Sequence, residues 1–321
     1  MPTSTKKTQL RQKTVYRVRN WREYEHALVK RGRVDLWLSE EGVAGWPYQG
    51  PKQRGAQFTF SDLAIETALT IKEVFHLSNR ATEGFVQSLL GLLKLNLKAP
   101  DHTTLSRRGT TVPIRLPKKA SGPLTLVVDG SGLKVYGEGE WKVRQHGVSK
   151  RRTWRKIHLG VDPVSGEIQA AMFSGAEISD GEMVAALLAQ VDQPISSLAG
   201  DGAYDQRQVY AALEDHSPGA RPLIPPRRGA HIWQHANSAD PPLARDENLR
   251  AMRAQGRAGW KKTSGYHQRS LAETAVFRFK RLFGSHLSAI LRPNQATQVA
   301  ARCRALNIRT HLGMPMSEKV A

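Results

Sequence analysis

The chain of 321 residues is 40% hydrophobic and 24% charged, which describes a folded globular protein with room for one large or two ordinary domains. Its formal net charge is +20, and such an excess of positive charge indicates a polyanionic partner, of which nucleic acid is the commonest inside cells. The single cysteine, Cys303, excludes an internal disulfide and a cysteine-based zinc site, and the apolar helical pattern around it predicts a place in the core.

The N-terminus lacks the apolar run of a secretory signal, and no segment approaches the roughly 18 to 20 apolar residues of a membrane span. We therefore expect a cytoplasmic protein without a membrane partner. Residues 1–19 are basic and polar, and they are typical of a flexible arm.

A small all-α domain is predicted over residues 20–110. Three apolar stripes at helical spacing each begin behind a residue that favours helix N-termini, namely Asn20, Ser61 and Ser78. A short basic helix then carries Arg107 and Arg108, which we select as candidate DNA contacts. Two packed helices ahead of a basic one fit either a helix-turn-helix variant or a plain helical bundle, and both interpretations stay open.

An α/β domain is predicted over residues 124–321, behind a linker at 111–123 that holds three prolines and two lysines. Its first apolar strand breaks into a Gly-Ser-Gly turn. A hairpin, a helix, a strand with a glycine turn, a second helix and a short strand follow, at 153–174, 179–192, 196–205, 206–216 and 221–226. The proline-rich basic stretch from 225 to about 260 is interpreted as irregular, and 266–280 as one helix. This order of elements predicts a mixed sheet flanked by helices.

Two aspartates stand where apolar strands end. Asp129 follows Leu-Thr-Leu-Val-Val and Asp201 follows Ser-Ser-Leu-Ala-Gly, each directly before a glycine. A carboxylate at the end of a buried strand faces the ligand crevice of an α/β sheet, although a turn aspartate that accepts backbone hydrogen bonds is the alternative for each. Asp162 is assigned to a hairpin turn and Asp180 to a helix start, while Asp205 is kept as a lesser candidate.

A glutamate in the last predicted helix lies on an unusual stripe. Tyr266, Arg269 and Lys280 fall within about 40° of Glu273 around a helix. Arg269 can bind a phosphate through two parallel hydrogen bonds, Lys280 offers a point charge, and Tyr266 can stack on a base or bind a phosphate. The alternative is a basic surface helix in which Arg269 and Glu273 form an ion pair across one turn.

Three carboxylates without a structural assignment match the needs of two-metal phosphodiester cleavage, in which two ions clamp the attacking and leaving oxygens. Mg²⁺ prefers Asp and Glu oxygens, so Asp129, Asp201 and Glu273 are the predicted ligands. No set of cysteines and histidines indicates zinc, no phosphate-binding loop of an NTPase is present, and the surroundings of Ser131 do not match a nucleophile elbow.

The sequence resembles the DDE-type transposases of bacterial insertion sequences. Tyr266, Arg269, Glu273 and Lys280 reproduce the spacing Y-x2-R-x3-E-x6-K of that family's YREK signature, and the two aspartate motifs precede it in the family's order. The resemblance extends over residues 20–315.

The resemblance implies a ribonuclease-H-like catalytic domain that cuts DNA at the ends of a mobile element. It assigns the family's metal ligands to Asp129, Asp201 and Glu273, and contact with the DNA strand to Tyr266, Arg269 and Lys280. Two Mg²⁺ ions are expected, with Mn²⁺ as a substitute. The implied partners are double-stranded DNA, from element ends and target, and further copies of the chain on paired ends. The implied setting is the bacterial nucleoid.

Two other functions remain in view: a catalytically silent DNA-binding relic that acts as a repressor, and a ribonuclease-H-type nuclease with another substrate. The intact set of three acids argues against the first, and the basic N-terminal region argues against the second. Only 72 residues separate Asp201 from Glu273, so the large β-rich insert of some relatives is absent and a hairpin intermediate is left open.

Overall fold

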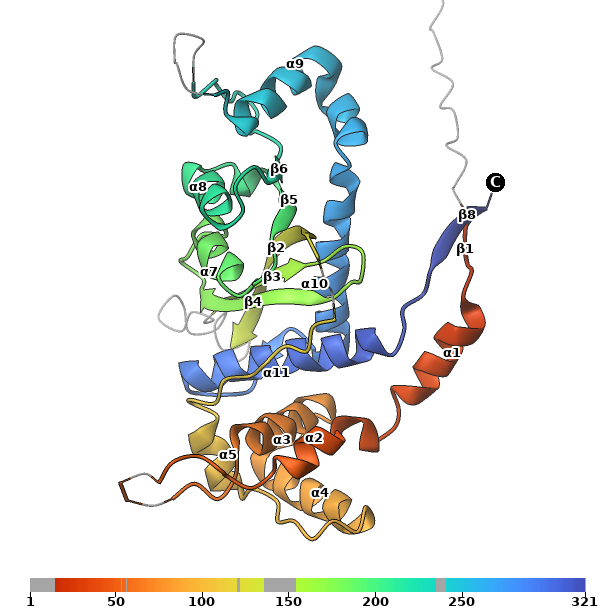
Figure 1. The fold of residues 1–321 in the computed structure, drawn as a ribbon, viewed down its shortest axis with the longest axis vertical. Helices are drawn as coiled ribbons and strands as arrows, with labels where there is room; N and C mark the ends of the chain where they lie inside the picture. Colours follow the sequence, from red (N-terminus) through yellow and green to blue (C-terminus); the bar gives the residue numbers. More distant parts are fainter. Residues whose placement is uncertain are drawn as a thin grey trace, which may run out of the picture.

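The computed structural model describes residues 15–52, 54–55, 57–119, 122–135, 154–234 and 241–320. Within them, a mixed β-sheet with helices on both faces is joined to a group of N-terminal helices (Figure 1). Most of the predicted basic arm, and the part of the first aspartate motif that follows Val135, lie outside the described residues. None of the described helices combines the length and the apolarity that a membrane crossing requires.

The helices expected in the N-terminal region are present. Helix α3 (Asp62–Val74) begins behind Ser61, whose hydroxyl accepts a hydrogen bond from Ala64 N–H at 3.1 Å, and α4 (Asn79–Leu92) begins in the same way behind Ser78. The region is completed by α1 (Trp21–Lys30), η1 (Asp35–Trp37), α2 (Glu40–Ala44) and α5 (His102–Arg108).

Asn20 does not cap α1 with its side chain, in contrast to the prediction. Its amide instead donates to the carbonyl of Met314 at 3.0 Å and accepts from the N–H of Met316 at 2.7 Å. Strand β1 (Val15–Val18) also pairs with β8 (Ser317–Val320), so the two ends of the described chain lie together beside α1 (Figure 1).

The sheet has the strand order β4-β3-β2-β5-β6. Its strands are β2 (Leu124–Val135), β3 (Trp154–Val161), β4 (Ile168–Gly175), β5 (Ile195–Ala199) and β6 (Arg221–Leu223). Strands β2, β3 and β4 pair antiparallel, whereas β2, β5 and β6 pair parallel, and the short β7 (His286–Leu287) pairs with the far end of β2. Asp162 accepts hydrogen bonds from two backbone N–H groups of the β3–β4 turn, which confirms its predicted role.

Alternate residues of β2 face two different helix layers. Leu126 and Val128 pack with α7 (Val184–Leu188) and α8 (Arg207–His216), whereas Val127 and Leu133 pack with α10 (Ser270–Phe283) and α11 (Arg292–His311). Because side chains alternate along a strand, Asp129 and Ser131 face α10, and Gly130 and Gly132 face the other layer.

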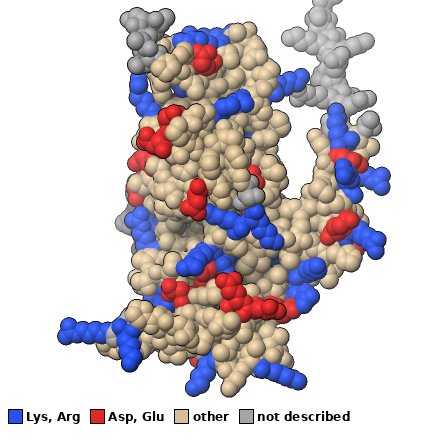
Figure 2. Space-filling view, viewed as in Figure 1, with Lys and Arg blue, Asp and Glu red and all other residues tan. Residues whose placement is uncertain are grey.

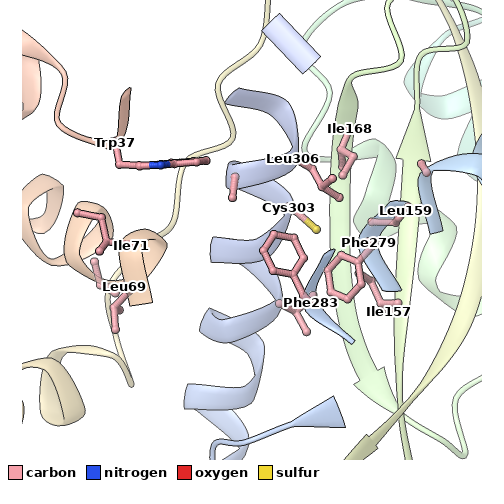
Figure 3. Packing of buried hydrophobic residues seen from close by; sticks show 14 of the residues in the cluster. Trp37, Leu69, Ile71, Ile157, Leu159, Ile168, Phe279, Phe283, Cys303 and Leu306 are labelled. Carbon is pink, nitrogen blue, oxygen red and sulfur yellow. The ribbon is translucent and has the colours of Figure 1, made fainter. Parts of the chain in front are cut away.

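Helix α11 is buried on two sides. Figure 3 shows Cys303 and Leu306 facing the sheet, while Ile71 and Trp37 lie on the side of the N-terminal helices. Cys303 is fully buried, as predicted. One continuous hydrophobic cluster therefore runs from the N-terminal helices through α11 to the sheet.

Two buried acids of α3 bind α11. Glu73 accepts from the guanidinium of Arg302 at 2.7 Å and from the amide of Gln298, and Glu66 forms an ion pair with Arg304. Burial raises the pKa of Glu66, and the charge of Arg304 opposes that shift. These pairs fix the position of the N-terminal helices relative to α11 and the sheet.

Two predictions about the chain after residue 225 were wrong. The stretch taken as irregular contains α9 (Ala244–Thr263), which bends at Gly256 where φ is 74°. The single helix predicted at 266–280 is instead a 3-10 turn, η5 (Tyr266–Arg269), followed by α10. Gly265, with φ of 79°, provides the left-handed residue that separates α9 from η5.

We expect Arg302→Ala to lower the free energy of unfolding by about 2 to 3 kcal/mol, because it removes a buried guanidinium that donates to Glu73 at 2.7 Å and leaves that carboxylate with only the more distant ammonium of Lys72, at 3.4 Å. Arg250→Ala is the matched control, since Arg250 pairs with Glu247 on the surface, where such pairs contribute roughly 0 to 1 kcal/mol. Urea unfolding followed by circular dichroism measures both. Equal losses in the two variants would contradict a structural role for the buried pair.

Candidate active site

Asp129 lies inside strand β2 and not after it, which corrects the predicted Gly-Ser-Gly turn. Strand β3 pairs with β2 without interruption from Val127–Val161 to Lys134–Trp154, so the ladder keeps the glycines extended. Gly132 is covered by the ring of Trp154, which lies 3.2 Å from the position that a Cβ would occupy. The glycines therefore serve close packing here and do not break the strand.

Asp201 lies beside Asp129 because of the parallel register of β2 and β5. Val127 pairs with Ala199, the last residue of β5, and two further steps along both chains bring Asp129 level with Asp201. Neighbouring strands lie about 4.8 Å apart. One carboxylate oxygen of Asp201 caps the 3-10 turn η4 (Gly202–Tyr204) by accepting from Ala203 N–H at 2.8 Å, and the other has no hydrogen bond among the described residues.

Glu273 lies on the first turn of α10. Five buried residues of this helix join the hydrophobic cluster that it shares with the sheet and α11, namely Ala272, Ala275, Val276, Phe279 and Phe283. The side chain of Glu273 itself is 52% exposed and forms an ion pair with Arg269 one turn earlier. The pairing considered from the sequence as an alternative is thus present, and the charges of both partners act on Asp129.

The pKa of Asp129 responds to the charges of the other predicted site residues. Burial raises the pKa of the Asp129 carboxyl to about 6, against a hydrogen bond from Gly130 N–H and the charge of Arg269, while the charges of Glu273 and Asp201 raise it further. Burial lowers the pKa of Arg269, but its hydrogen bond to Glu273 and the nearby Tyr266 and Asp129 raise it overall. Three acids and one guanidinium therefore share one site.

The donor atoms of this site are carboxylate oxygens, which suit Mg²⁺ or Mn²⁺. Within the described residues, however, no three Asp, Glu, His or Cys side chains are arranged to hold an ion directly. Glu273 is turned to Arg269, so the acids fit a divalent ion by the type of their donor atoms, and side-chain rotation would be needed for them to close around one.

Tyr266 is a packing residue in this conformation. It is 8% exposed, and its ring lies 5.4 Å from that of Trp260 in α9, with the charged groups of Lys261 and Arg269 also near its face. Burial raises the pKa of its hydroxyl. The structure thus places Tyr266 at the junction of α9 and η5, beneath Arg269.

Lys280 faces the strand that carries Asp129. Its ammonium donates to the hydroxyl of Ser131 at 2.7 Å, and Ser131 lies on the same face of β2 as Asp129. Lys280 therefore lies close to the site although it is two helical turns from Glu273. The sequence had suggested Ser131 only as a rejected nucleophile, and its role as the acceptor for Lys280 was missed.

The two basic residues of α5 have different surroundings. Arg108 is 7% exposed, pairs with Asp62, donates to the carbonyl of Phe60 at 2.9 Å and lies over the ring of Phe58. Its guanidinium therefore makes its contacts within the N-terminal region. Arg107 is exposed and lines a large surface cleft, so its predicted contact with DNA stays a prediction.

The remaining aspartates separate into two groups. Asp205, the lesser candidate, is buried in an ion pair with Arg245 at 3.0 Å and anchors α9. Asp180 stands at a helix start, as predicted, directly before the 3-10 turn η3 (Gly181–Met183), but its side chain makes no cap bond and lies against Gly130. The sequence signal for this contact was Gly130, because a glycine inside a strand often marks a place where another part of the chain approaches the backbone closely.

We expect Asp129→Asn to stabilise the metal-free protein at pH 8 by about 1 to 2 kcal/mol, after allowance for solvent screening. The folded-state pKa of about 6 lies above the ordinary value of 3.8, so the ionised carboxylate destabilises the fold above pH 6. The advantage of the variant should fade between pH 6 and pH 4. Urea unfolding in EDTA at pH 4, 6 and 8 measures it, and an advantage independent of pH would contradict the assignment.

Two protein-family models match the chain, and both describe a transposase DDE domain. One covers residues 120–308, which is more than half of the chain, and the other covers residues 29–138. The first match contains the whole sheet, with Asp129, Asp201 and Glu273 inside it. The mixed sheet with helices on both faces is the ribonuclease-H-like fold that the sequence led us to expect. The chain therefore belongs to the DDE transposase family, whose members act on DNA and cleave it.

Proposed function

We propose that this chain is an active transposase. It binds the terminal inverted repeats of its own insertion sequence, cleaves the DNA there by two-metal chemistry, and joins the ends to target DNA. What supports the proposal is that the charges of Asp201, Glu273 and Arg269 all act on the half-buried carboxylate of Asp129, and that Glu273 and Arg269 form an ion pair. Acids alone would repel a phosphodiester, whereas acids that hold cations beside a guanidinium attract one.

The three carboxylates would hold two Mg²⁺ ions, for which Mn²⁺ substitutes, and these ions supply charge stabilisation to the attacking and leaving oxygens. A bound cation would stabilise the ionised form of Asp129, which burial disfavours in the metal-free protein. Glu273 would turn from Arg269 toward the aspartates, and its exposed place on the first turn of α10 leaves room for that rotation.

The same rotation would release Arg269. Its guanidinium would then bind the phosphate next to the scissile one through two parallel hydrogen bonds. Lys280, held by Ser131, would place a less directional charge on the flanking backbone. Tyr266 would support Arg269 from below and meet the DNA strand at the edge of η5. This division of roles gives each member of the YREK spacing a separate task.

A cleft of about 1120 Å³ between the N-terminal helices and the segment after α10 is the best candidate for the DNA backbone away from the site. Its lining includes Lys72, Arg80, Arg107 and His286. His286 pairs with Lys134, five residues along β2 from Asp129, which corresponds to about 17 Å of strand. A duplex could therefore contact both places. On the face in Figure 2, basic and acidic side chains are interspersed, so the positive charge does not form one patch there.

Joining two ends to one target favours a homo-oligomer that forms on paired ends at the nucleoid. A silent DNA-binding relic and a ribonuclease-H-type nuclease are the competing functions. A cleavage assay with element-end DNA, unrelated duplex and an RNA–DNA hybrid separates the three: the transposase cuts the first, the relic cuts none, and the nuclease prefers the hybrid.

We expect Glu273→Gln to reduce DNA cleavage in Mg²⁺ by at least about 100-fold while binding of the same DNA stays within about threefold, since phosphate contacts supply most of the affinity. Glu247→Gln is the matched control, because it also removes an acid from an exposed pair with an arginine on a helix. Single-turnover cleavage and filter binding measure the two effects. Cleavage by the Glu273 variant at the wild-type rate would exclude it as a ligand.

We expect Arg269→Lys to lower the single-turnover cleavage rate about tenfold or more with little loss of affinity, because lysine keeps the charge but loses the paired hydrogen bonds. Lys280→Arg should be tolerated, since arginine can still donate to Ser131. A salt titration beside the cleavage assay distinguishes rate from affinity. Equal losses of rate in the two variants would show that the two cations do not have separate roles.

A further inference from the structure

Three glycines that adjoin aspartates are each closely approached by a side chain. The carboxylate of Asp180 lies 2.8 to 3.1 Å from the position of a Cβ on Gly130, the neighbour of Asp129. The ring of Tyr204 lies 2.8 Å from that position on Gly200, the neighbour of Asp201, and Gln206 lies 2.7 Å from it on Gly181, the neighbour of Asp180. Of these contacts, the one between Asp180 and Gly130 joins an aspartate outside the predicted site to the neighbour of a predicted metal ligand.

Asp180 is held firmly in this place by strand β3. Lys156 donates to its carboxylate at 3.3 Å and to the carbonyl of Ile178 at 2.8 Å. His158, which is fully buried, has its Nδ1 3.5 Å from the same carboxylate and its Nε2 2.8 Å from the hydroxyl of Ser174. These contacts fix the position of a charged side chain that caps no helix and belongs to no predicted site.

The carboxylate of Asp180 covers one face of Gly130. Gly130 is the next residue after Asp129 along β2, and its Cα packs on Asp180 across the opposite face of the strand. Any shift of Asp180 thus reaches Asp129 through a single residue. The hydroxyl of Tyr204 is also fully buried without a hydrogen-bond partner in the described part of the chain, and it lies near Asp180, Asp129 and Asp201.

We infer that Asp180 is a positioning residue of the active site: by packing on Gly130 it fixes the backbone from which Asp129 projects, and thereby sets the affinity of the site for the divalent ion. The inference rests on the proposed metal-binding role of Asp129. Asp180 acts through contact and is not itself a ligand, which agrees with the pairing of its charge by Lys156. Supporting groups of this kind typically change metal affinity 10- to 100-fold.

The test measures Mn²⁺ binding to the full chain without DNA, by calorimetry or by the electron paramagnetic resonance of free Mn²⁺. Asp180→Ala and Gly130→Ala should each weaken binding about tenfold. Asp180→Asn keeps the shape that packs on Gly130, so its affinity should stay within about threefold. The double variant should be no weaker than either single one, because both changes break the same contact. Asp215→Ala, an exposed aspartate of α8, is the matched control.

Two results would overturn the inference. If Asp180→Ala binds Mn²⁺ as tightly as the wild type, Asp180 only stabilises the hairpin of β3 and β4. If Asp180→Asn is as weak as Asp180→Ala, the charge acts directly and Asp180 is a ligand. Should Asp180→Ala fail to fold, the comparison of Asp180→Asn with Gly130→Ala still decides between contact and charge. Asp129→Asn tests the proposed metal site separately from the role of Asp180. If this variant binds Mn²⁺ as the wild type does, the proposed metal site itself is wrong, whatever the Asp180 variants show.

Discussion

Strand β2 continues for eight residues beyond Val127, the last position at which β5 pairs with it, and the short β7 covers only its final two residues. The edge between these pairings is open toward α10. Because of this mismatch in strand length, the part of β2 that carries Asp129 extends past the pairing with β5, and Asp201 lies just past the end of β5. The antiparallel ladder with β3 keeps the open part of β2 straight, since β3 pairs along its other edge through Lys134. Without that ladder, the glycines beside Asp129 would allow the strand to turn away.

The two sides of the crevice are stabilised in different ways. On the α10 side, the apolar face of α10 packs on the sheet, and Glu273 pairs with Arg269 outside that contact. The side chain of Glu273 is exposed there, so it can rotate without disturbing the core. Beneath the strand, by contrast, the partly buried Asp180 pairs with Lys156 and packs beside the buried ring of His158. The proposed binding of two ions and a phosphodiester would need both properties: fixed aspartates for affinity, and a mobile pair that opens when the substrate arrives.

The N-terminal helices are bound to the catalytic half more closely than a linker between separate domains suggests. Their core continues into α11, and buried Glu73 and Glu66 depend on arginines from that helix. Burial of charge makes such a junction sensitive to mismatch, since an unpaired acid there is costly. The cleft with Arg107 lies along the same junction, so DNA bound there would meet a surface whose orientation to Asp129 is fixed by these pairs.

The sequence by itself determined the fold class and the family, and it selected the three acids that remain the predicted metal ligands, because apolar runs, strand-end aspartates and a fixed spacing of charged residues are local signals. It also predicted the capped helices of the N-terminal region and the turn at Asp162. Only the tertiary structure decided that β2 runs on through Gly130, that Tyr266 and Arg269 lie on a 3-10 turn, and that Arg108 is buried while Arg107 is exposed. It alone brought Asp180 against Gly130 and Lys280 onto Ser131. These outcomes depend on which strand pairs with β2 and on which side chain fills the space beside a glycine. The last two contacts join residues 50 and 149 positions apart, and a local sequence pattern carries no information over such separations.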